Sequence, residues 1–288
     1  MKLLGLALGA LLAAANAAAP ALVTADVVPP ATPAQADKTI TFSTKAKAVG
    51  HKYTTSEEMR TKFTVVVGNQ TVNMEGVENE ERKTEVLAVK DGLATKVRAT
   101  YTKHTKDVKT DGKPKDERSP VAGKTYLVER KGDAIVVTDN AGKAVSPDEQ
   151  KKIEGDYKRL GKPDEVTNAL KSKPRKIGDK LDDVAAALAG QLKDRGSKAG
   201  SNVTVEQTKL VLSGTKRIDG ADHAVLDLTM KLSGDEPNGK LTMTLGGQVF
   251  VRIDEASFGE IAVSGPITMT GKGADLRGTT SMKTKTAP

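Results

Sequence analysis

The sequence has no cysteine and no tryptophan, and it has only four tyrosines and four phenylalanines among its 288 residues. Without cysteine, the chain can form no disulfide, no thiolate metal site and no iron–sulfur cluster. It also lacks a cysteine nucleophile and the cysteine that a bacterial lipoprotein acylates. Aromatic residues make up 3% of the chain, so few rings are available to stack on sugars or on the bases of single-stranded nucleic acid. We therefore expect an aliphatic core and no specific binding of nucleic acid.

A strong excess of one charge is also missing. Lysine and arginine number 45 against 37 aspartates and glutamates, a net charge of +8, and acids accompany the bases almost everywhere. The exception is a segment in which four basic residues have no acid among them: Lys171, Lys173, Arg175 and Lys176. Each lysine or arginine near an anionic surface adds about 1 kcal/mol of attraction, so this basic cluster is a candidate contact with a membrane surface or another polyanion. The alternative, which we favour, is an ordinary solvated surface.

The first 25 residues have the pattern of a secretory signal peptide. A lysine precedes an apolar run at 3–15, which is shorter than the roughly 20 residues of a membrane-spanning helix. Small-residue cleavage sites end at residues 17, 25 and 36, so the signal extends to 25 or as far as 36. Residues 26–37 form a linker rich in proline and alanine. An uncleaved anchor is the alternative. We expect export to the periplasm or the outside of a bacterial cell, and no transmembrane helix in the mature chain.

The mature chain is predicted to contain two β-rich blocks with a helical segment between them. Apolar and polar residues alternate over much of 38–101 and again over 202–285, which is typical of half-buried strands. Asp-Gly pairs at 91–92 and 219–220 lie between alternating runs and predict tight hairpins, because both turn positions need a positive φ. Residues 103–119 show no apolar period, and we expect them to form an exposed loop.

The helical segment spans about 146–196. Ser146 and Glu149 form a capping box at the start of a first helix, a short second helix follows, and a third helix over 181–195 ends at Gly196. A meander sheet with one apolar face needs a cover, and these helices supply it. We therefore predict a mainly β protein with a helical insertion (α+β), built as a curved antiparallel meander sheet or half-barrel covered by two or three helices.

This order of elements is expected to form one domain over 38–288. It resembles the secreted or periplasmic half-barrels of the lipoprotein-localisation-factor type. The stretch 258–271 (FGEIAVSGPITMTG) is similar to uncharacterised secreted bacterial β-rich families. The resemblance implies a curved antiparallel sheet with helices against its concave face. It rests on element order, so no binding residue is carried over from either family.

No arrangement of residues in the sequence indicates catalysis. The P-loop-like spacing at 234–240 lacks the serine or threonine after its lysine and is followed by an alternating strand, so we interpret it as a hairpin loop. His51, His104 and His223 have no second histidine at ligand spacing, and we expect surface positions for all three. The acids at 78–81 are expected to be solvated. We therefore predict no enzymatic activity, no cofactor and no metal site.

The remaining candidate site is apolar. Six residues of two neighbouring strands are expected to face three residues of the last helix: Leu226, Leu228, Met230, Leu241, Met243 and Leu245 on the strands, with Val184, Leu188 and Leu192 on the helix. These residues could hold a lipid or another hydrophobic ligand under a helical lid, and unbranched methionine suits an adaptable cavity. The alternative is a filled core without a small-molecule ligand, in a structural or surface-interaction protein of the cell envelope.

Overall fold

The computed structural model describes residues 38–117, 119–198, 203–236, 239–271 and 274–287. The predicted signal peptide at 1–25 and the linker at 26–37 lie outside these residues. Within them the chain forms a large antiparallel sheet, a short two-stranded pair and three helices. None of these helices combines the length and the apolar composition that crossing a membrane requires.

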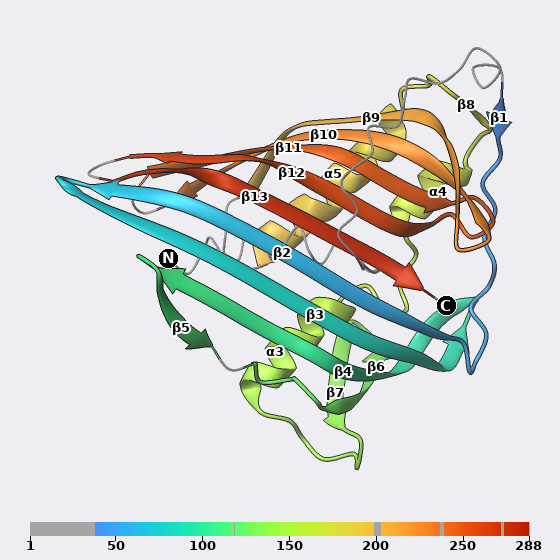
Figure 1. The fold of residues 1–288 in the computed structure, drawn as a ribbon. Coiled ribbons are helices and arrows are strands. Elements are labelled where there is room, and N and C mark those ends of the chain that lie inside the picture. The colour runs from blue at the N-terminus through green and yellow to red at the C-terminus, as the bar shows by residue number, and fades with distance from the viewer. Residues whose placement is uncertain (1–37, 118, 199–202, 237–238, 272–273, 288) are drawn as a thin grey trace.

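Eleven strands form the large sheet (Figure 1). Their bounds are β2 (Lys52–Val67), β3 (Gln70–Lys90), β4 (Leu93–Thr110), β5 (Lys113–Glu117), β6 (Thr125–Lys131), β7 (Ala134–Asp139), β9 (Val203–Ile218), β10 (Ala221–Glu236), β11 (Gly239–Arg252), β12 (Ser257–Thr270) and β13 (Ala274–Ala287). They lie in the order β7-β6-β4-β3-β2-β13-β12-β11-β10-β9, with β5 beside β4. Among the described residues the end strands β7 and β9 do not pair with each other, so the sheet is not closed. The predicted antiparallel meander with a helical insertion is confirmed.

A seam between β2 and β13 joins the two β-rich blocks into this one sheet. The two strands are antiparallel, with Ala274 opposite Val67 at one end and Ala287 opposite Thr54 at the other. The seam thus pairs the first long strand of the sheet with the last one. Because the register is the same at both ends, residues of β2 and β13 that share a row also share a face.

Three Asp-Gly turns close hairpins of the sheet. Asp91, Asp111 and Asp219 have φ values of 51°, 49° and 49°, and the glycine after each also has a positive φ, as the tight hairpin turn requires. The hairpins at 91 and 219 are confirmed. The expectation of a loop over 103–119 is wrong, because β4 runs on to Thr110 and pairs through the turn at Asp111 with β5. This part of β4 alternates between half-buried and exposed positions, but its half-buried residues are mostly polar.

The helices are α3 (Pro147–Tyr157), α4 (Glu165–Lys171) and α5 (Asp182–Lys198). The predicted capping box of α3 is confirmed by reciprocal hydrogen bonds between Ser146 and Glu149. The sequence predicts that the third helix ends at Gly196, but α5 continues to Lys198. Figure 1 shows α3 behind β3 and β4 and α5 behind the C-terminal strands, on the same side of the sheet.

Two separate clusters of buried apolar residues lie under these helices. The larger one lies between α4, α5 and the C-terminal strands and is aliphatic apart from two phenylalanines, as predicted. The smaller one lies under α3 and contains three of the four tyrosines: Val97, Ala99, Tyr101, Val121, Tyr126, Val128, Val137, Ile153 and Tyr157. The helical face of the sheet is therefore divided into two regions of different chemistry.

Candidate functional site

The nine apolar residues singled out in the sequence belong to one cluster in the fold. Leu226, Leu228 and Met230 lie on β10 and Leu241, Met243 and Leu245 on β11, while Val184, Leu188 and Leu192 lie on α5. None of the nine is more than 8% exposed. Strict alternation along β10 and β11 places the six strand residues on the face that α5 covers. We call this surface, together with the apolar residues continuous with it, the aliphatic face.

The aliphatic face crosses the seam of the sheet. In one row of the ladder, Leu232 lies opposite Met243 and Met243 opposite Ile267. The same row continues through Gly278 of β13 and, beyond the seam, through Phe63 and Met74. At Gly278 an added Cβ would lie 2.0 Å from the carbonyl oxygen of Lys62, so glycine permits the close approach of β2 and β13. The result is a row of five apolar side chains and one glycine across six strands.

Methionine is concentrated on this face. Met230, Met243 and Met282 are buried in the cluster, and three more methionines pack against it while remaining partly exposed: Met59, Met74 and Met269. These six are all the methionines after Met1. Methionine is unbranched and polarisable, so it fills irregular space and adapts to differently shaped apolar partners. The partly exposed ones give the face an adaptable margin.

One end of α5 is fixed to the edge of the sheet. The Leu181 amide donates to the Leu210 carbonyl at 2.9 Å, and the Leu212 amide donates to the Asp179 carbonyl at 3.0 Å. These bonds use backbone groups of β9 that an edge strand would otherwise expose. The N-terminal end of the helix is therefore fastened to β9.

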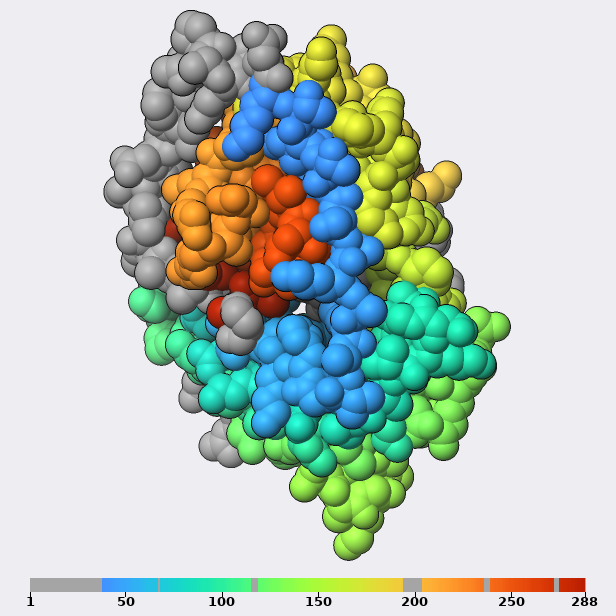
Figure 2. Space-filling view, turned by 90° about the vertical axis from the view of Figure 1, so that its right-hand side faces the viewer, coloured from blue at the N-terminus to red at the C-terminus, as the bar shows by residue number. Residues whose placement is uncertain are grey.

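The segment 38–50 closes one end of the aliphatic region. Figure 2 shows this segment crossing the end of the molecule, between the ends of the C-terminal strands and the helical residues. Ile40 and Phe42 are 3% and 4% exposed and belong to the aliphatic cluster. The Ser43 amide donates to the Ile253 carbonyl at 3.0 Å, and Ile40 lies in β1 (Thr39–Ile40), which pairs with β8 (Arg175–Lys176). Apolar anchors and backbone pairing hold the segment in place.

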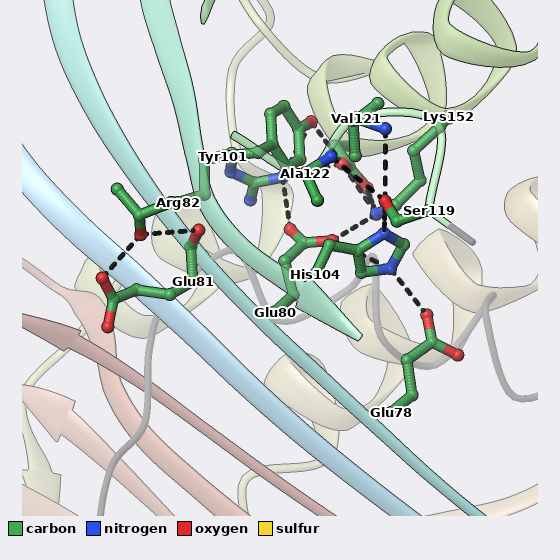
Figure 3. Close-up of polar contacts among 12 residues, drawn as sticks. Glu78, Glu80, Glu81, Arg82, Tyr101, His104, Ser119, Val121, Ala122 and Lys152 are labelled. Atoms are coloured by element: carbon green, nitrogen blue, oxygen red, sulfur yellow. Dashed lines mark hydrogen bonds and ion pairs between the residues drawn. The ribbon is translucent and has the colours of Figure 1, made fainter. Parts of the chain in front are cut away.

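A cluster of charged residues occupies the same face under α3. Arg82 Nη1 lies 2.8 Å from Asp156 Oδ2 and 3.2 Å from Glu80 Oε1. Lys152 Nζ lies 2.6 Å from Glu80 Oε2 and 2.9 Å from Asp156 Oδ2. The Tyr101 hydroxyl donates to Asp156 Oδ2 at 2.6 Å. Figure 3 shows part of this network. The side chains of Arg82 and Glu80 are only 3% and 5% exposed, so α3 is joined to the sheet by buried ionic contacts.

Glu57 adds a third carboxyl to this polar cluster. It lies on β2 directly opposite Glu80, and burial, followed by the negative charge of Glu80, raises its pKa well above the usual value. Asp156 behaves in the opposite way. Burial acts to raise the pKa of Asp156, but Lys152 and Arg82 outweigh it and lower the pKa. Glu57 therefore ionises less readily than an ordinary carboxyl, whereas Asp156 ionises more readily beside the cations Arg82 and Lys152.

The expectation of solvated acids at 78–81 is therefore wrong for Glu80, which is buried and paired. The prediction that all three histidines lie on the surface is also wrong, because it fails for His223 and His104. His223 is 5% exposed, and burial is the main cause that lowers its pKa. The side chain of His104 is 9% exposed and contacts Glu78 and Ser119. The apparent P-loop at 234–240 is a hairpin, as predicted, since Glu236 pairs with Gly239 across it.

The basic cluster at 171–176 is not a uniform surface patch. Lys171, Lys173 and Lys176 are exposed. Arg175 is 1% exposed, and its Nη2 lies 2.6 Å from Asp183 Oδ2 and donates to the Ala169 carbonyl at 2.6 Å. The assignment of Arg175 to an anionic-surface contact is therefore wrong, because its charge is used to join α4 to α5. In the part of the chain that the structure describes, no three acidic or histidine side chains are grouped as a metal site.

Comparisons with known proteins give only weak likenesses. No family model matches the sequence, and no curated protein matches it. Among solved structures, one match is lipovitellin, from a study of its lipid–protein interactions, with 7% sequence identity and a TM-score of 0.35. The matched region covers 85% of this chain but only 26% of the lipovitellin chain. A DUF1329 family protein from Desulfovibrio piger is 8% identical with a TM-score of 0.14, with coverage of 83% and 84%. MucB in complex with MucA(peri) is 11% identical with a TM-score of 0.11, with coverage of 79% and 88%. The site must be interpreted from its own geometry.

Proposed function

We propose that the protein is an exported binding protein that holds a lipid or another hydrophobic ligand on the aliphatic face, beneath α5. One observation carries the proposal: a row of five apolar side chains and one glycine crosses six strands on the face that α5 covers, and its margin is formed by partly exposed methionines. An ordinary core between one helix and a few strands does not need to extend across the seam into β2 and β3. An acyl chain is long, flexible and apolar, and a methionine-lined surface of this extent matches it.

Export is the second part of the proposal, and the N-terminal sequence supports it. The apolar run at 3–15, followed by small-residue cleavage sites, has the pattern of a signal peptide. Outside the cytoplasm a protein without cysteine needs no oxidising folding machinery. N-terminal sequencing of the chain recovered from a bacterial periplasm or culture medium tests this part. A mature N-terminus between residues 18 and 37 is expected, and an intact Met1 on an exported or membrane-attached chain contradicts it.

The ligand is tested by native mass spectrometry of the purified mature protein and by titration with a dansylated undecanoic acid. We expect adducts of lipid mass and saturable fluorescence of the probe. Met269→Lys places a charge at the margin of the aliphatic face and should weaken probe binding at least about tenfold, equivalent to about 1.4 kcal/mol. Thr268→Lys is the matched control, because residue 268 is exposed on the opposite face of the same strand, and it should leave binding unchanged. A clean ligand-free mass together with no probe binding would show that the aliphatic face is only a packed core.

A further inference from the structure

Ser119, His104 and Glu78 form a hydrogen-bonded chain at one margin of the polar cluster (Figure 3). Ser119 Oγ lies 2.5 Å from His104 Nδ1, and His104 Nε2 lies 3.1 Å from Glu78 Oε1. The three residues come from different elements, since Glu78 lies on β3, His104 on β4 and Ser119 beyond β5. A hydroxyl, an imidazole and a carboxylate in this order are the parts of a serine nucleophile with its base and the group that orients the base.

A bulge in β4 places His104 on this face. Arg82 pairs with Tyr101, whereas Glu81 pairs with Lys103, so Thr102 is an extra residue in the strand. Without the bulge, residues 101 and 104 would point to opposite faces of the sheet. The Thr102 hydroxyl donates to Glu81 Oε1 at 2.6 Å, which fixes the bulge. The histidine is thus brought beside Glu78 by a defined irregularity of the strand.

Ser119 is held just as firmly. Its Oγ accepts hydrogen bonds from the amides of Val121 and Ala122, each at 3.2 Å. Val121 is fully buried, and two residues later the Gly123 amide donates to the Tyr101 carbonyl at 2.7 Å. The turn that carries the serine is therefore attached to the strand that carries the histidine. Such preorganisation is what a catalytic pair requires.

The hydrogen bonds define the role of each atom. Because Ser119 Oγ already accepts from two amides, its own proton points to Nδ1, and the Nε2 proton then points to Glu78. Burial acts to raise the pKa of Glu78, but the hydrogen bond from His104 and the nearby charges, Lys152 and Lys106 among them, together outweigh it and the pKa is lowered. Glu78 is thus held as an acceptor for the imidazole. The two amides bond to Oγ itself, so they stabilise negative charge that develops on this oxygen.

We infer that Ser119 is an acylatable nucleophile, with His104 as its general base and Glu78 as the residue that positions the imidazole. Ser119 Oγ attacks the carbonyl carbon of a carboxylic ester while its proton passes to His104 Nδ1. The bond from the carbonyl carbon to the leaving alkoxide then breaks, and His104 returns the proton to the alkoxide as alcohol. A water molecule, deprotonated by His104, hydrolyses the acyl–serine ester, which releases the carboxylic acid and restores the hydroxyl of Ser119.

The surroundings of the histidine indicate the substrate class. The carboxyl oxygens of Glu78 and Glu80 lie 3.1 Å and 3.8 Å from His104 Nε2. Arg82 and Lys152 lie against Glu80, so cations largely balance the carboxyl charge around the histidine. An uncharged ester is therefore the substrate class that fits. The inference is independent of the proposed hydrophobic ligand, because the aliphatic face contributes none of these three residues.

A fluorophosphonate probe tests the nucleophile directly, since a serine activated in this way displaces fluoride from phosphorus and keeps the phosphonyl group. Intact mass and peptide mapping should show one adduct on Ser119. Ser119→Ala should abolish the adduct, while Ser264→Ala, an exposed serine on β12, should leave it unchanged. His104→Gln should slow labelling about 100-fold or more, the usual contribution of a general base. Each variant is checked for a wild-type thermal transition.

Hydrolysis of p-nitrophenyl acetate then separates positioning from mere structure. Wild-type protein should show a burst of one p-nitrophenol per chain and an acetyl group on Ser119. Glu78→Gln should lower the acylation rate and shift its pH profile, whereas a purely structural role for Glu78 would lower stability without moving the profile. No adduct on wild-type protein, an adduct elsewhere, or equal labelling of a folded His104→Gln variant would overturn the inference.

Discussion

Two regions on the same face of the sheet differ in what they bury. The region under α5 is aliphatic, whereas the region under α3 adds buried charged side chains to its own apolar cluster. Under α5 the sheet presents leucine, isoleucine and methionine. Under α3 it presents Glu80, Arg82 and Tyr101, which contact Lys152 and Asp156 of the helix. Both regions use the same antiparallel framework and the same alternation of side chains. The comparison shows that the side chains on the sheet, and not the antiparallel backbone, determine how each helix is attached.

The two modes of attachment have different consequences. Apolar packing is non-directional, so a helix on an aliphatic surface can shift slightly and still bury the same area. A buried ionic cluster is directional, and removing one partner leaves another charge buried and unpaired. The region under α5 therefore suits an adaptable ligand surface, whereas the region under α3 suits a rigid support for a turn such as the one at Ser119.

The largest expected effect is the loss of Arg82. Arg82→Ala removes one of the two cations that Asp156 and Glu80 share, and breaking such a buried pair costs about 3–5 kcal/mol. Asp156 has a lowered pKa, so its contribution to stability is present above about pH 4 and is lost as the pH falls through the lowered pKa. The destabilisation measured by urea unfolding should therefore be smaller at pH 3.5 than at pH 7. Arg60→Ala removes an exposed pair with Glu58 and should cost less than about 1 kcal/mol.

The matching change in the aliphatic region should be slightly smaller and independent of pH. Leu226 is fully buried, and Leu226→Ala should cost about 3 kcal/mol through lost burial and the cavity that remains. No titratable group is removed, so the cost should be the same at pH 3.5 and pH 7. Asp227→Ala, on the exposed face of the same strand, should change the free energy of unfolding by less than about 0.5 kcal/mol. Equal pH dependence for Leu226→Ala and Arg82→Ala would contradict the division into two regions.

The aliphatic region could be predicted from the sequence because its signal is strong. Leu226, Leu228 and Met230 alternate with polar residues, and that pattern admits one interpretation, a strand with one buried face. The Asp-Gly turns at 91 and 219 were equally clear. The third, at Asp111, was missed because the strand before it alternates between polar residues of different burial, so no apolar period marks it.

The polar region could not be found in the same way, because charged residues on a buried face resemble a solvated one. A usable signal was nevertheless present. Counting back in steps of two from the apolar Val86 gives Thr84, Arg82, Glu80 and Glu78, and all four lie in the inward phase. Lys152 and Asp156 flank the buried Ile153 on α3. Only the fold brings these two sets together, and the bulge at Thr102 that turns His104 inward leaves no mark in the sequence.

The smallest expected effect lies inside the polar cluster and has the opposite sign. The pKa of Glu57 is raised by burial and by Glu80, so its stability contribution is complete below its unfolded pKa and is lost as the pH rises through the raised value. Glu57→Gln keeps the shape without the charge, and it should slightly increase the free energy of unfolding at pH 7 but not at pH 3.5. Glu58→Gln is the matched control, because the pKa of Glu58 is lowered by its hydrogen bond from Arg60. Glu58→Gln should slightly lower the free energy of unfolding at pH 7. If both variants instead raised the free energy of unfolding by the same amount, Glu57 would be simply a surface carboxylate.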